Sequence, residues 1–304
     1  AHTGSWRSCP LSYFGCQMSM NILGRPIGTS VSVFSHFGEL VQGPVLQNGD
    51  ITYTLVSLPC PKMVTSFELT DVELQIPGSL TRNLWARLHN RFGVRHRFSV
   101  KKLTSLPAGK GLGTSTADLY CAAKRFNAVY NVFPSAQAMF KFATAGEVAS
   151  DPIYIKRPTL FAQQDRYVLE PLPTTGRIIH MLGTFSKARH VVDTKALSHR
   201  AYTVEHLLTY RCCLRHLRDG LMRGDLDLIA RGCCLSAEMN SDFVPLADLS
   251  SLWRLAQAAN SAGYCVSHSG SAIAFMFGDG QDRAQATKKL MDQGYETLEF
   301  DARL

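Results

Sequence analysis

The chain has 304 residues and a mass of 33.6 kDa; 45% of its residues are hydrophobic and 18% are charged. This length can bury a substantial core, in one large domain or in two closely packed ones. No uninterrupted apolar run approaches the roughly 18 residues of a membrane-spanning helix, and the first 30 residues lack the basic start and apolar core of a secretory signal. We therefore expect a globular protein without a membrane partner.

The formal net charge of +8 raises the question of nucleic-acid binding. The basic residues are dispersed, and even the densest stretch, Arg87–Lys102, lacks a stacked-aromatic signature and zinc-finger spacing. Attraction of anionic nucleotides is an equally economical use of the surplus charge. We expect no nucleic-acid partner.

The nine cysteines are odd in number and scattered along the chain. Adjacent pairs occur at Cys212–Cys213 and Cys233–Cys234, which is not the spacing of a metal site. This usage predicts a reduced, cytoplasmic protein without structural zinc.

Strand patterns dominate the first part of the chain. Between residues 30 and 103, several segments are rich in β-branched and aromatic residues or alternate in polarity: TSVSVF, ITYTLVSL, VTSFELT, VELQI and HRFSVKKL. Apolar residues at helical spacing predict helices over residues 80–92, 115–132 and 136–144.

The pattern changes near residue 176, where RIIHML predicts a strand. Helices are then expected over residues 202–221, 225–239, 252–262 and 283–293, with a strand–turn–strand in YCVSHSGSAIAFMF and a last strand in TLEF. This order predicts an α+β fold in two lobes. We divide the chain into an N-terminal extension over residues 1–29, a first lobe over 30–175 and a second lobe over 176–304.

A glycine-rich loop precedes the helix predicted from residue 115. Gly109, Gly111 and Gly113 allow backbone N–H groups to point at one small centre, because glycine adopts backbone angles that other residues resist and leaves room for close approach. We expect Thr114 or Ser115 at the helix N-cap, beside free N–H groups that favour an anion. The loop therefore predicts a phosphate site; the alternative is a flexible turn capped by serine.

Two common phosphate motifs do not fit this loop. Lys110 precedes a glycine, whereas the Walker A lysine follows the last glycine and precedes Ser or Thr, and the G-x-G-x-x-G fingerprint fails on spacing. Instead PAGKGLGTSTA, residues 107–117, resembles the P-x-x-x-G-L-G-S-S-A loop of the GHMP kinases. SHFGELVQG, residues 35–43, and SHSGSAIAF, residues 267–275, occur in the order of that family.

The resemblance covers about residues 30–280, and within the family it is strongest to the L-threonine kinases of cobalamin side-chain synthesis. It implies a two-lobed GHMP kinase fold, with an N-terminal ATP-binding lobe like domain 2 of ribosomal S5 and a ferredoxin-like C-terminal lobe. It also implies ATP and Mg²⁺ as cofactors. The implied ATP-binding residues are Pro107, Ala108, Gly109, Lys110, Gly111, Leu112, Gly113, Thr114, Ser115 and Thr116.

The same resemblance assigns the metal and the catalytic residues. Ser115 and Glu147 are expected to bind Mg²⁺; the alternatives are a pure helix cap and a solvated helix end. Asp151 is expected to contact the acceptor hydroxyl as base or electrostatic partner, against a turn or N-cap aspartate. Glu147 and Asp151 are four residues apart, where the threonine kinases have carboxylates three apart, and would share a face if the segment were helical. Asp118 is expected to complement the helix dipole.

The acceptor pocket is expected to involve Glu39 and Gln42, which lie between two glycines after a predicted strand. Glu39 would meet an ammonium group and Gln42 a hydroxyl or carboxylate; the alternative is a polar strand end. The turn residues expected to close the pocket opposite the loop are Ser269, Gly270 and Ser271, and Lys187 or Arg189 is a further candidate for the acceptor carboxylate. His36 is expected in a turn, and His268 is either a turn residue or a ligand.

Together these assignments predict transfer of a phosphoryl group from ATP to the side-chain hydroxyl of a small amino acid, L-threonine before L-homoserine. Phosphoryl transfer depends mainly on charge compensation and alignment of the attacking oxygen, and a buried zwitterion needs partners for both of its charges. Two other classes stay open: a nucleotide-binding regulator without a working base, and a nucleic-acid-binding protein like the fold's ribosomal relatives. The oligomeric state is not predicted.

Overall fold

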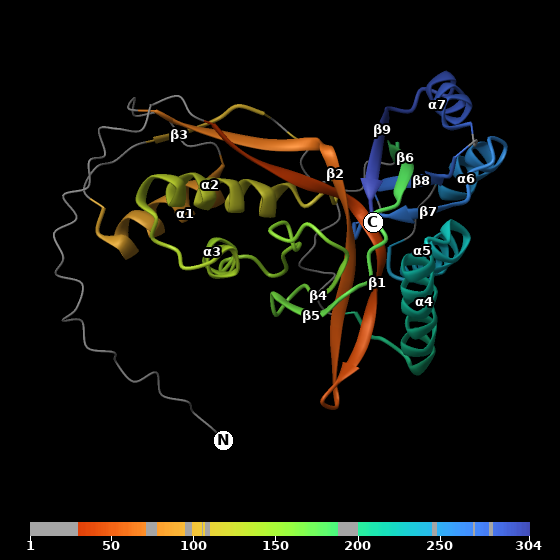
Figure 1. Ribbon diagram of the computed structural model, residues 1–304, viewed down its shortest axis with the longest axis horizontal. Helices are drawn as coiled ribbons and strands as arrows, with labels where there is room; N and C mark the ends of the chain where they lie inside the picture. The colour runs from red at the N-terminus through yellow and green to blue at the C-terminus, as the bar shows by residue number, and fades with distance from the viewer. Residues whose placement is uncertain are drawn as a thin grey trace.

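The computed structural model describes residues 30–70, 78–94, 99–104, 106, 110–187, 200–244, 248–269, 271–279 and 282–304. Within these residues one antiparallel sheet has the strand order β5-β4-β2-β1-β7-β8-β6-β9, with β3 paired to β2 (Figure 1). The strands are β1 (Ser30–Gln47), β2 (Asp50–Thr70), β3 (Ser99–Lys102), β4 (Thr159–Ala162), β5 (Tyr167–Pro171), β6 (Ile178–Phe185), β7 (Gly263–Val266), β8 (Ala272–Phe277) and β9 (Thr297–Arg303). Helices on this sheet confirm the predicted α+β class.

Seven helices accompany the sheet in the described part of the chain: α1 (Ser79–Phe92), α2 (Thr114–Tyr130), α3 (Ala136–Ala143), α4 (Val204–Arg223), α5 (Leu226–Ser241), α6 (Leu249–Gln257) and α7 (Arg283–Asp292). All seven were predicted, with ends that differ by a few residues. Figure 1 shows α1, α2 and α3 on one side of the β1–β2 hairpin and α4 to α7 on the other. None of these helices is long and apolar enough to cross a membrane.

The β1–β2 hairpin is central to the packing, because both of its faces are buried against helices. On β2, Tyr53 and Leu55 pack with α1, α2 and α3, whereas Val56 and Leu58 pack with α4 and α5. Successive side chains of a strand point to opposite faces, so a run of apolar residues can serve two cores. A third cluster lies under α6 and α7 and includes Leu252 and Phe275.

Two predicted boundaries in this hairpin are wrong. The segments ITYTLVSL and VTSFELT form one strand, β2, and the GELVQG segment is part of β1 instead of following it. β1 continues because register shifts on both sides of Glu39 absorb the irregularity. Gly38 also permits a close approach of the chain after β7: its φ is +84°, and a Cβ added to it would lie 2.9 Å from the backbone nitrogen of Ser267. Glu39 is thereby placed inside the sheet, opposite Val266 of β7.

Two short strands were not predicted, and some predicted features lie outside the described residues. β4 and β5 are only four and five residues long, and their sequence has no clear alternation. VELQI, the start of HRFSVKKL and the proposed extension over residues 1–29 fall outside the described ranges. The division into lobes near residue 175 stays a prediction, since the sheet runs through both parts.

Candidate active site

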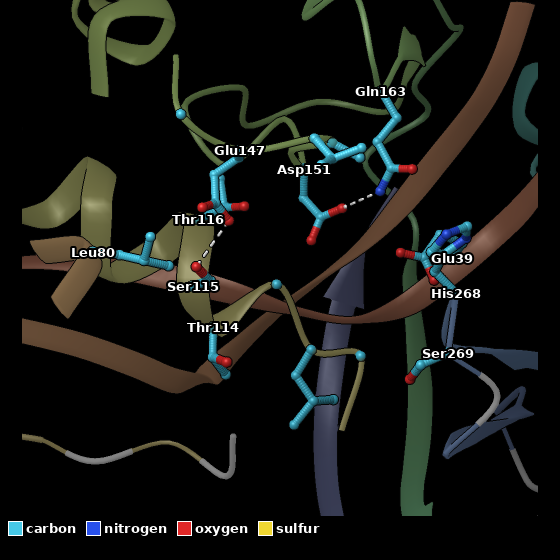
Figure 2. A pocket seen from close by; sticks show the side chains of 16 residues that line it. Glu39, Leu80, Thr114, Ser115, Thr116, Glu147, Asp151, Gln163, His268 and Ser269 are labelled. Carbon is cyan, nitrogen blue, oxygen red and sulfur yellow. Dashed lines mark hydrogen bonds between the residues drawn. The ribbon is translucent and has the colours of Figure 1, made fainter. Parts of the chain in front are cut away.

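A pocket of about 490 Å³ lies where the glycine loop, the start of α2 and the segment after α3 meet β1 and the β7–β8 turn (Figure 2). The described residues that line it are Glu39, Leu80, Gly111, Leu112, Gly113, Thr114, Ser115, Thr116, Gly146, Glu147, Val148, Ala149, Asp151, Gln163, His268 and Ser269. Most predicted site residues among the described ones are therefore brought together. Pro107, Ala108, Gly109, Arg189 and Gly270 lie outside the described residues.

The loop reaches the pocket with its backbone. Gly111 and Gly113 have φ of +65° and +64°, which favours glycine, and an added Cβ would lie 2.1 Å from Ser269 Oγ and 2.3 Å from Asp151 Oδ2, respectively. Between them, Leu112 inserts its side chain into the core, and the Ser35 hydroxyl donates a hydrogen bond to the Leu112 carbonyl. The loop is thus anchored to β1 while its glycines allow other groups to come close.

The start of α2 differs from the predicted cap. The helix begins at Thr114, and its N-cap is Gly113 in a left-handed conformation, with no capping hydrogen bond from the side chain of a described residue. A cap by Thr114 or Ser115 is therefore wrong: Gly113 takes the cap position because it adopts the positive φ that the tight loop requires. The Ser115 hydroxyl instead donates to Glu147 Oε2 at 3.0 Å, and both residues line the pocket (Figure 2).

The segment from Glu147 to Asp151 is not helical, because α3 ends at Ala143. The two carboxylates therefore do not share a helix face, and the chain directs them to different partners. Glu147 meets Ser115, and its carbonyl accepts a hydrogen bond from Arg166. Asp151 extends towards the loop glycines and the end of β4 (Figure 2).

Asp151 is buried, and its two carboxylate oxygens have different surroundings. Gln163 Nε2 donates to its Oδ1 at 3.2 Å, and its Oδ2 faces Gly113. Burial raises the pKa of Asp151 to about 6, and the hydrogen bond from Gln163 offsets part of that rise. Gln163 also accepts a backbone hydrogen bond from Ser150 at 3.2 Å, so it fixes this segment by both backbone and side chain.

The wall opposite α2 is formed by Glu39 and His268 (Figure 2). Glu39 is 3% exposed, and its Oε2 has no hydrogen-bond partner among the described residues. Burial raises the pKa of Glu39 well above its usual range; the charge of Asp151 adds to the rise, while the backbone of His268 and the charge of Arg200 oppose it. Bringing a cation to this carboxyl would favour its charged form.

Behind this wall, both polar atoms of the Gln42 side-chain amide form hydrogen bonds. Its Nε2 donates to the Val266 carbonyl at 3.3 Å, and its Oε1 accepts from the Tyr53 hydroxyl at 2.7 Å. Gln42 therefore supports the wall and does not line the pocket. His268 completes this network, with its Nδ1 2.8 Å from the Tyr53 hydroxyl and 3.1 Å from Gln42 Oε1.

The serine turn between β7 and β8 closes one end of the pocket. Ser269 Oγ lies 2.9 Å from Ser271 Oγ and 3.4 Å from Ser267 Oγ, and Ser267 Oγ accepts from the Ala272 backbone at 3.0 Å. Ser269 lines the pocket next to Gly111, whereas Ser271 lies behind it and is 5% exposed. The turn thus packs against Gly111 of the glycine loop, whereas the sequence analysis placed it opposite the loop.

Several residues that the sequence analysis singled out lie away from the pocket or have a different role. Lys110 Nζ is 5.8 Å from the ring centroid of Phe185 and is not among the lining residues. Lys187 Nζ is 4.2 Å from the ring centroid of Tyr295 and donates to a backbone carbonyl, so its ammonium is engaged away from the pocket. Asp118 forms an ion pair with Lys102 at 2.6 Å in place of the expected dipole role. His36 is buried within β1 and not in a turn.

The residues that line the pocket fit a nucleoside triphosphate with Mg²⁺. The uncapped N–H groups of α2 and a loop that only glycine can form suit phosphate oxygens. The Ser115 hydroxyl and the Glu147 carboxylate are hard oxygen ligands 3.0 Å apart. Mg²⁺ is usually held by one or two carboxylates, with water and phosphates completing its coordination. Within the described residues no three His, Cys, Asp or Glu side chains converge on one point.

Sequence reasoning missed Gln163 and left His268 undecided. Gln163 follows the short β4, and nothing in its neighbourhood signals a partner 12 residues earlier. The signal for His268 was its place beside the serine turn, which showed proximity to the pocket but not the network behind it. Leu80 and Val148 are apolar residues that are 46% exposed at the pocket, a feature that only the tertiary structure reveals.

Comparison with known proteins identifies solved structures that share this fold. No protein-family model matches the chain, and no curated protein gives a significant match. Solved structures do match: homoserine kinase from Cytophaga hutchinsonii (15% identity, 92% of this chain and 96% of that one, TM-score 0.63) and mevalonate kinase from L. major in complex with R-mevalonate (12%, 90% and 94%, 0.64). A third is phosphomevalonate kinase from Streptococcus pneumoniae in complex with phosphomevalonate and AMPPNP (16%, 91% and 99%, 0.65).

These three enzymes are GHMP-type kinases, and this chain has their fold over at least nine tenths of its length. The fold expected from the sequence motifs is therefore confirmed. At these identities the likeness shows the fold alone, so activity has to be argued from the pocket.

Proposed function

We propose that this protein is an ATP-dependent kinase of the GHMP type that phosphorylates the hydroxyl of a small molecule. The observation that carries the proposal is the meeting of three features in one pocket: the glycine loop at the start of α2, the Ser115–Glu147 pair, and the buried Asp151. Phosphoryl transfer needs an anion cradle, a place for the metal and an oriented acceptor oxygen. Each feature supplies one of these needs.

Three groups of pocket residues have separate roles in the proposed phosphoryl transfer. Backbone N–H groups of Gly111, Gly113 and the first turn of α2 hold the phosphates. Ser115 and Glu147 are the protein ligands of Mg²⁺, which when bound neutralises charge on the phosphate oxygens. Asp151, with Oδ1 held by Gln163, keeps Oδ2 for the acceptor hydroxyl, which it orients and deprotonates.

The acceptor we propose is a hydroxy amino acid, with L-threonine first and L-homoserine second. Glu39 supports this choice, because it lines the pocket together with Asp151, and its Oε2, which has no partner among the described residues, suits an ammonium group. Sugars and mevalonate have no ammonium group. The GELVQG, STAD and HSGS segments favour threonine within the family, and the structural likeness to a homoserine kinase keeps homoserine as the alternative.

We also propose that residues 30–175 form the ATP-binding lobe and residues 176–304 the second lobe. Each part has a core cluster of its own, one around Leu84, Phe126 and Phe161 and the other around Leu252 and Phe275. A third cluster joins residues of both parts. This arrangement supports two lobes that share the sheet.

The test is phosphorylation by the purified full-length chain with ATP and Mg²⁺. ADP release is measured with L-threonine, L-homoserine, L-serine, mevalonate and galactose, and ³¹P NMR identifies the phosphoester. We expect the highest kcat/KM with L-threonine. A best rate with mevalonate or galactose contradicts the amino-acid assignment, and no acceptor-dependent ADP release with any of them contradicts the kinase assignment.

Glu39→Gln tests the acceptor assignment within the same assay. The variant keeps the size of the side chain and removes its negative charge, so the KM for L-threonine should rise by roughly 10-fold or more, as for loss of a hydrogen bond to a charged group. The ATP affinity should stay within about twofold of the parent value, by the same scale. An unchanged KM for L-threonine means that Glu39 does not bind the amino group.

A further inference from the structure

Three polar atoms behind the pocket wall form a closed triangle. The Tyr53 hydroxyl lies 2.7 Å from Gln42 Oε1 and 2.8 Å from His268 Nδ1, and Gln42 Oε1 lies 3.1 Å from His268 Nδ1. All three distances are those of hydrogen bonds. The hydrogens available to these atoms therefore decide the protonation of the imidazole.

The orientation of Gln42 is fixed first. Its Nε2 lies 3.3 Å from the Val266 carbonyl and must be the donor there, so Oε1 faces the triangle as an acceptor with no hydrogen of its own. If Nδ1 of His268 carried a lone pair, the single Tyr53 hydrogen would have to serve both edges that Tyr53 makes, and on the third edge Oε1 and Nδ1 would face each other as two acceptors. With a hydrogen on Nδ1, every edge has a donor.

The imidazole is then neutral, with the hydrogen on Nδ1. Burial, helped by the charge of Arg200, lowers the pKa of His268 to about 3, so a second proton is not held near neutral pH. Which ring nitrogen is protonated follows from the hydrogen bond that the other nitrogen makes. Nε2 therefore carries a lone pair, and no described residue donates a hydrogen bond to it, while the ring lines the pocket.

We propose that His268 is a specificity-determining residue, whose Nε2 accepts a hydrogen bond from the protonated amine of the acceptor beside Glu39. Glu39 Oε2 has no hydrogen-bond partner among the described residues, and Glu39 and His268 lie on the same wall of the pocket (Figure 2). The proposal rests on the proposed kinase function and specifies how it selects its acceptor. The chemical class selected at this wall is a primary ammonium, the amine of a hydroxy amino acid.

The alternatives to an amine fit this wall poorly. A carboxylate or phosphate placed there would find no donor at His268 Nε2 and would repel Glu39 whenever that carboxyl is ionised, and leaving such groups unpaired is costly. A neutral hydroxyl can donate to His268 Nε2, but it brings no charge that would favour the ionised form of Glu39. An ammonium has three hydrogens, enough for both atoms, and its positive charge favours the ionised, accepting form of Glu39.

The first experiment measures the tautomer directly. In ¹⁵N-histidine-labelled full-length protein, the two ring nitrogens of His268 are assigned with the help of a His268→Asn variant, and their chemical shifts are read near neutral pH. We expect a protonated Nδ1, an unprotonated Nε2, and a shift of the Nε2 signal when L-threonine is added. A protonated Nε2, or a doubly protonated ring, overturns the proposal whether or not the protein is a kinase.

The second experiment compares two replacements of His268. Asn places an amide nitrogen near the position of Nδ1, so it keeps the donor to Gln42 and loses the Nε2 acceptor; Gln places a polar atom near Nε2 and loses the donor. We expect His268→Asn to raise the KM for L-threonine by roughly 10- to 100-fold, the effect of losing a hydrogen bond to a charged group. His268→Gln should recover part of this loss, and ATP affinity should not change in either variant.

The matched acceptor for this comparison is 3-hydroxybutyrate, which has the hydroxyl and carboxylate of threonine but no amine. With 3-hydroxybutyrate as acceptor, the kcat/KM of the His268→Asn variant should stay within about twofold of the parent value. An equal loss for both acceptors would show a structural role and overturn the proposal. If the parent protein phosphorylates nothing, the proposed kinase function fails, while L-threonine binding followed through the Nε2 signal still decides the role of His268.

Discussion

The two walls of the pocket are built in different ways. The wall of Gly111, Gly113 and the start of α2 is one continuous stretch of chain that offers mainly backbone groups. The opposite wall brings together Glu39, Gln42 and His268, and joins residues up to 226 positions apart through side-chain contacts.

The difference separates a general task from a selective one. Backbone N–H groups at a helix start bind any phosphate and depend little on neighbouring side chains. A wall of buried side chains fixes the number and direction of its lone pairs, and so selects the chemistry of its ligand. Changes to the loop wall should therefore abolish catalysis for every acceptor, and changes to the opposite wall should change which acceptor is used.

Asp151, which lies between the two walls, should give the largest effect. Asp151→Asn removes the base, so kcat should fall by roughly 10²- to 10⁴-fold while ATP binding persists. In the parent, kcat/KM should fall as the pH drops below about 6, because protonation of Asp151 inactivates it. Steady-state kinetics from acid to neutral pH check both; a loss below about threefold would leave Asp151 as a turn residue.

The same variant should be more stable than the parent at neutral pH. The folded-state pKa of about 6 exceeds the ordinary 3.8, so the folded protein binds this proton more tightly, and the stability it contributes at low pH is lost as the pH rises through 6. Ionised Asp151 therefore costs up to about 3 kcal/mol above pH 6. Urea unfolding of both proteins should show this difference at neutral pH and little of it below the ordinary pKa.

Gly113→Val should give the next largest effect, on the loop wall. The left-handed φ of +64° resists a branched side chain, and its Cβ would lie 2.3 Å from Asp151 Oδ2. ATP affinity, measured by calorimetry, should fall by at least roughly 100-fold as the cradle is displaced. The matched control is Gly93→Val, with φ of +61° and no atom of a described residue within 4 Å of its added Cβ. Unchanged ATP affinity in a folded Gly113→Val protein would contradict the phosphate assignment.

Ser115→Ala should have a smaller effect that depends on the metal. Removing the hydroxyl that lies 3.0 Å from Glu147 takes away one oxygen ligand, so the Mg²⁺ concentration for half-maximal rate should rise by roughly 10-fold. Ser115→Thr keeps the hydroxyl and should restore most of the response. Equal Mg²⁺ dependence in the parent and in Ser115→Ala would remove Ser115 from the metal site.

Gln163→Leu should give the smallest effect, and it is visible as a shift in pH dependence. Loss of the hydrogen bond to Oδ1 removes the only described contact that lowers the pKa of Asp151, so the acid limb of the kcat/KM profile should move to higher pH. At high pH the rate should recover to within roughly 10-fold of the parent. Gln164→Leu, the same change at an exposed neighbour, should leave the profile in place. An unmoved limb in Gln163→Leu would make Gln163 a structural residue only.

The sequence by itself determined the parts of the protein that are local. The helices could be predicted because apolar residues recur along a few turns, and the phosphate loop because glycines and a helix start are neighbours in the chain. Even there, the cap was misassigned. The hydroxyls of Thr114 and Ser115 are typical of an N-cap, but the left-handed turn placed Gly113 at that position and freed Ser115 to meet Glu147.

Only the tertiary structure decided how the remote residues meet. Glu39 faces the pocket because bulges in β1 and the pairing with Val266 fix its register, and a shift of one residue would turn its side chain to the other face. The Tyr53–Gln42–His268 triangle and the Gln163–Asp151 contact depend on the same strand order. Strand order and register are set by the burial of whole faces, so no local pattern near these residues reveals their partners.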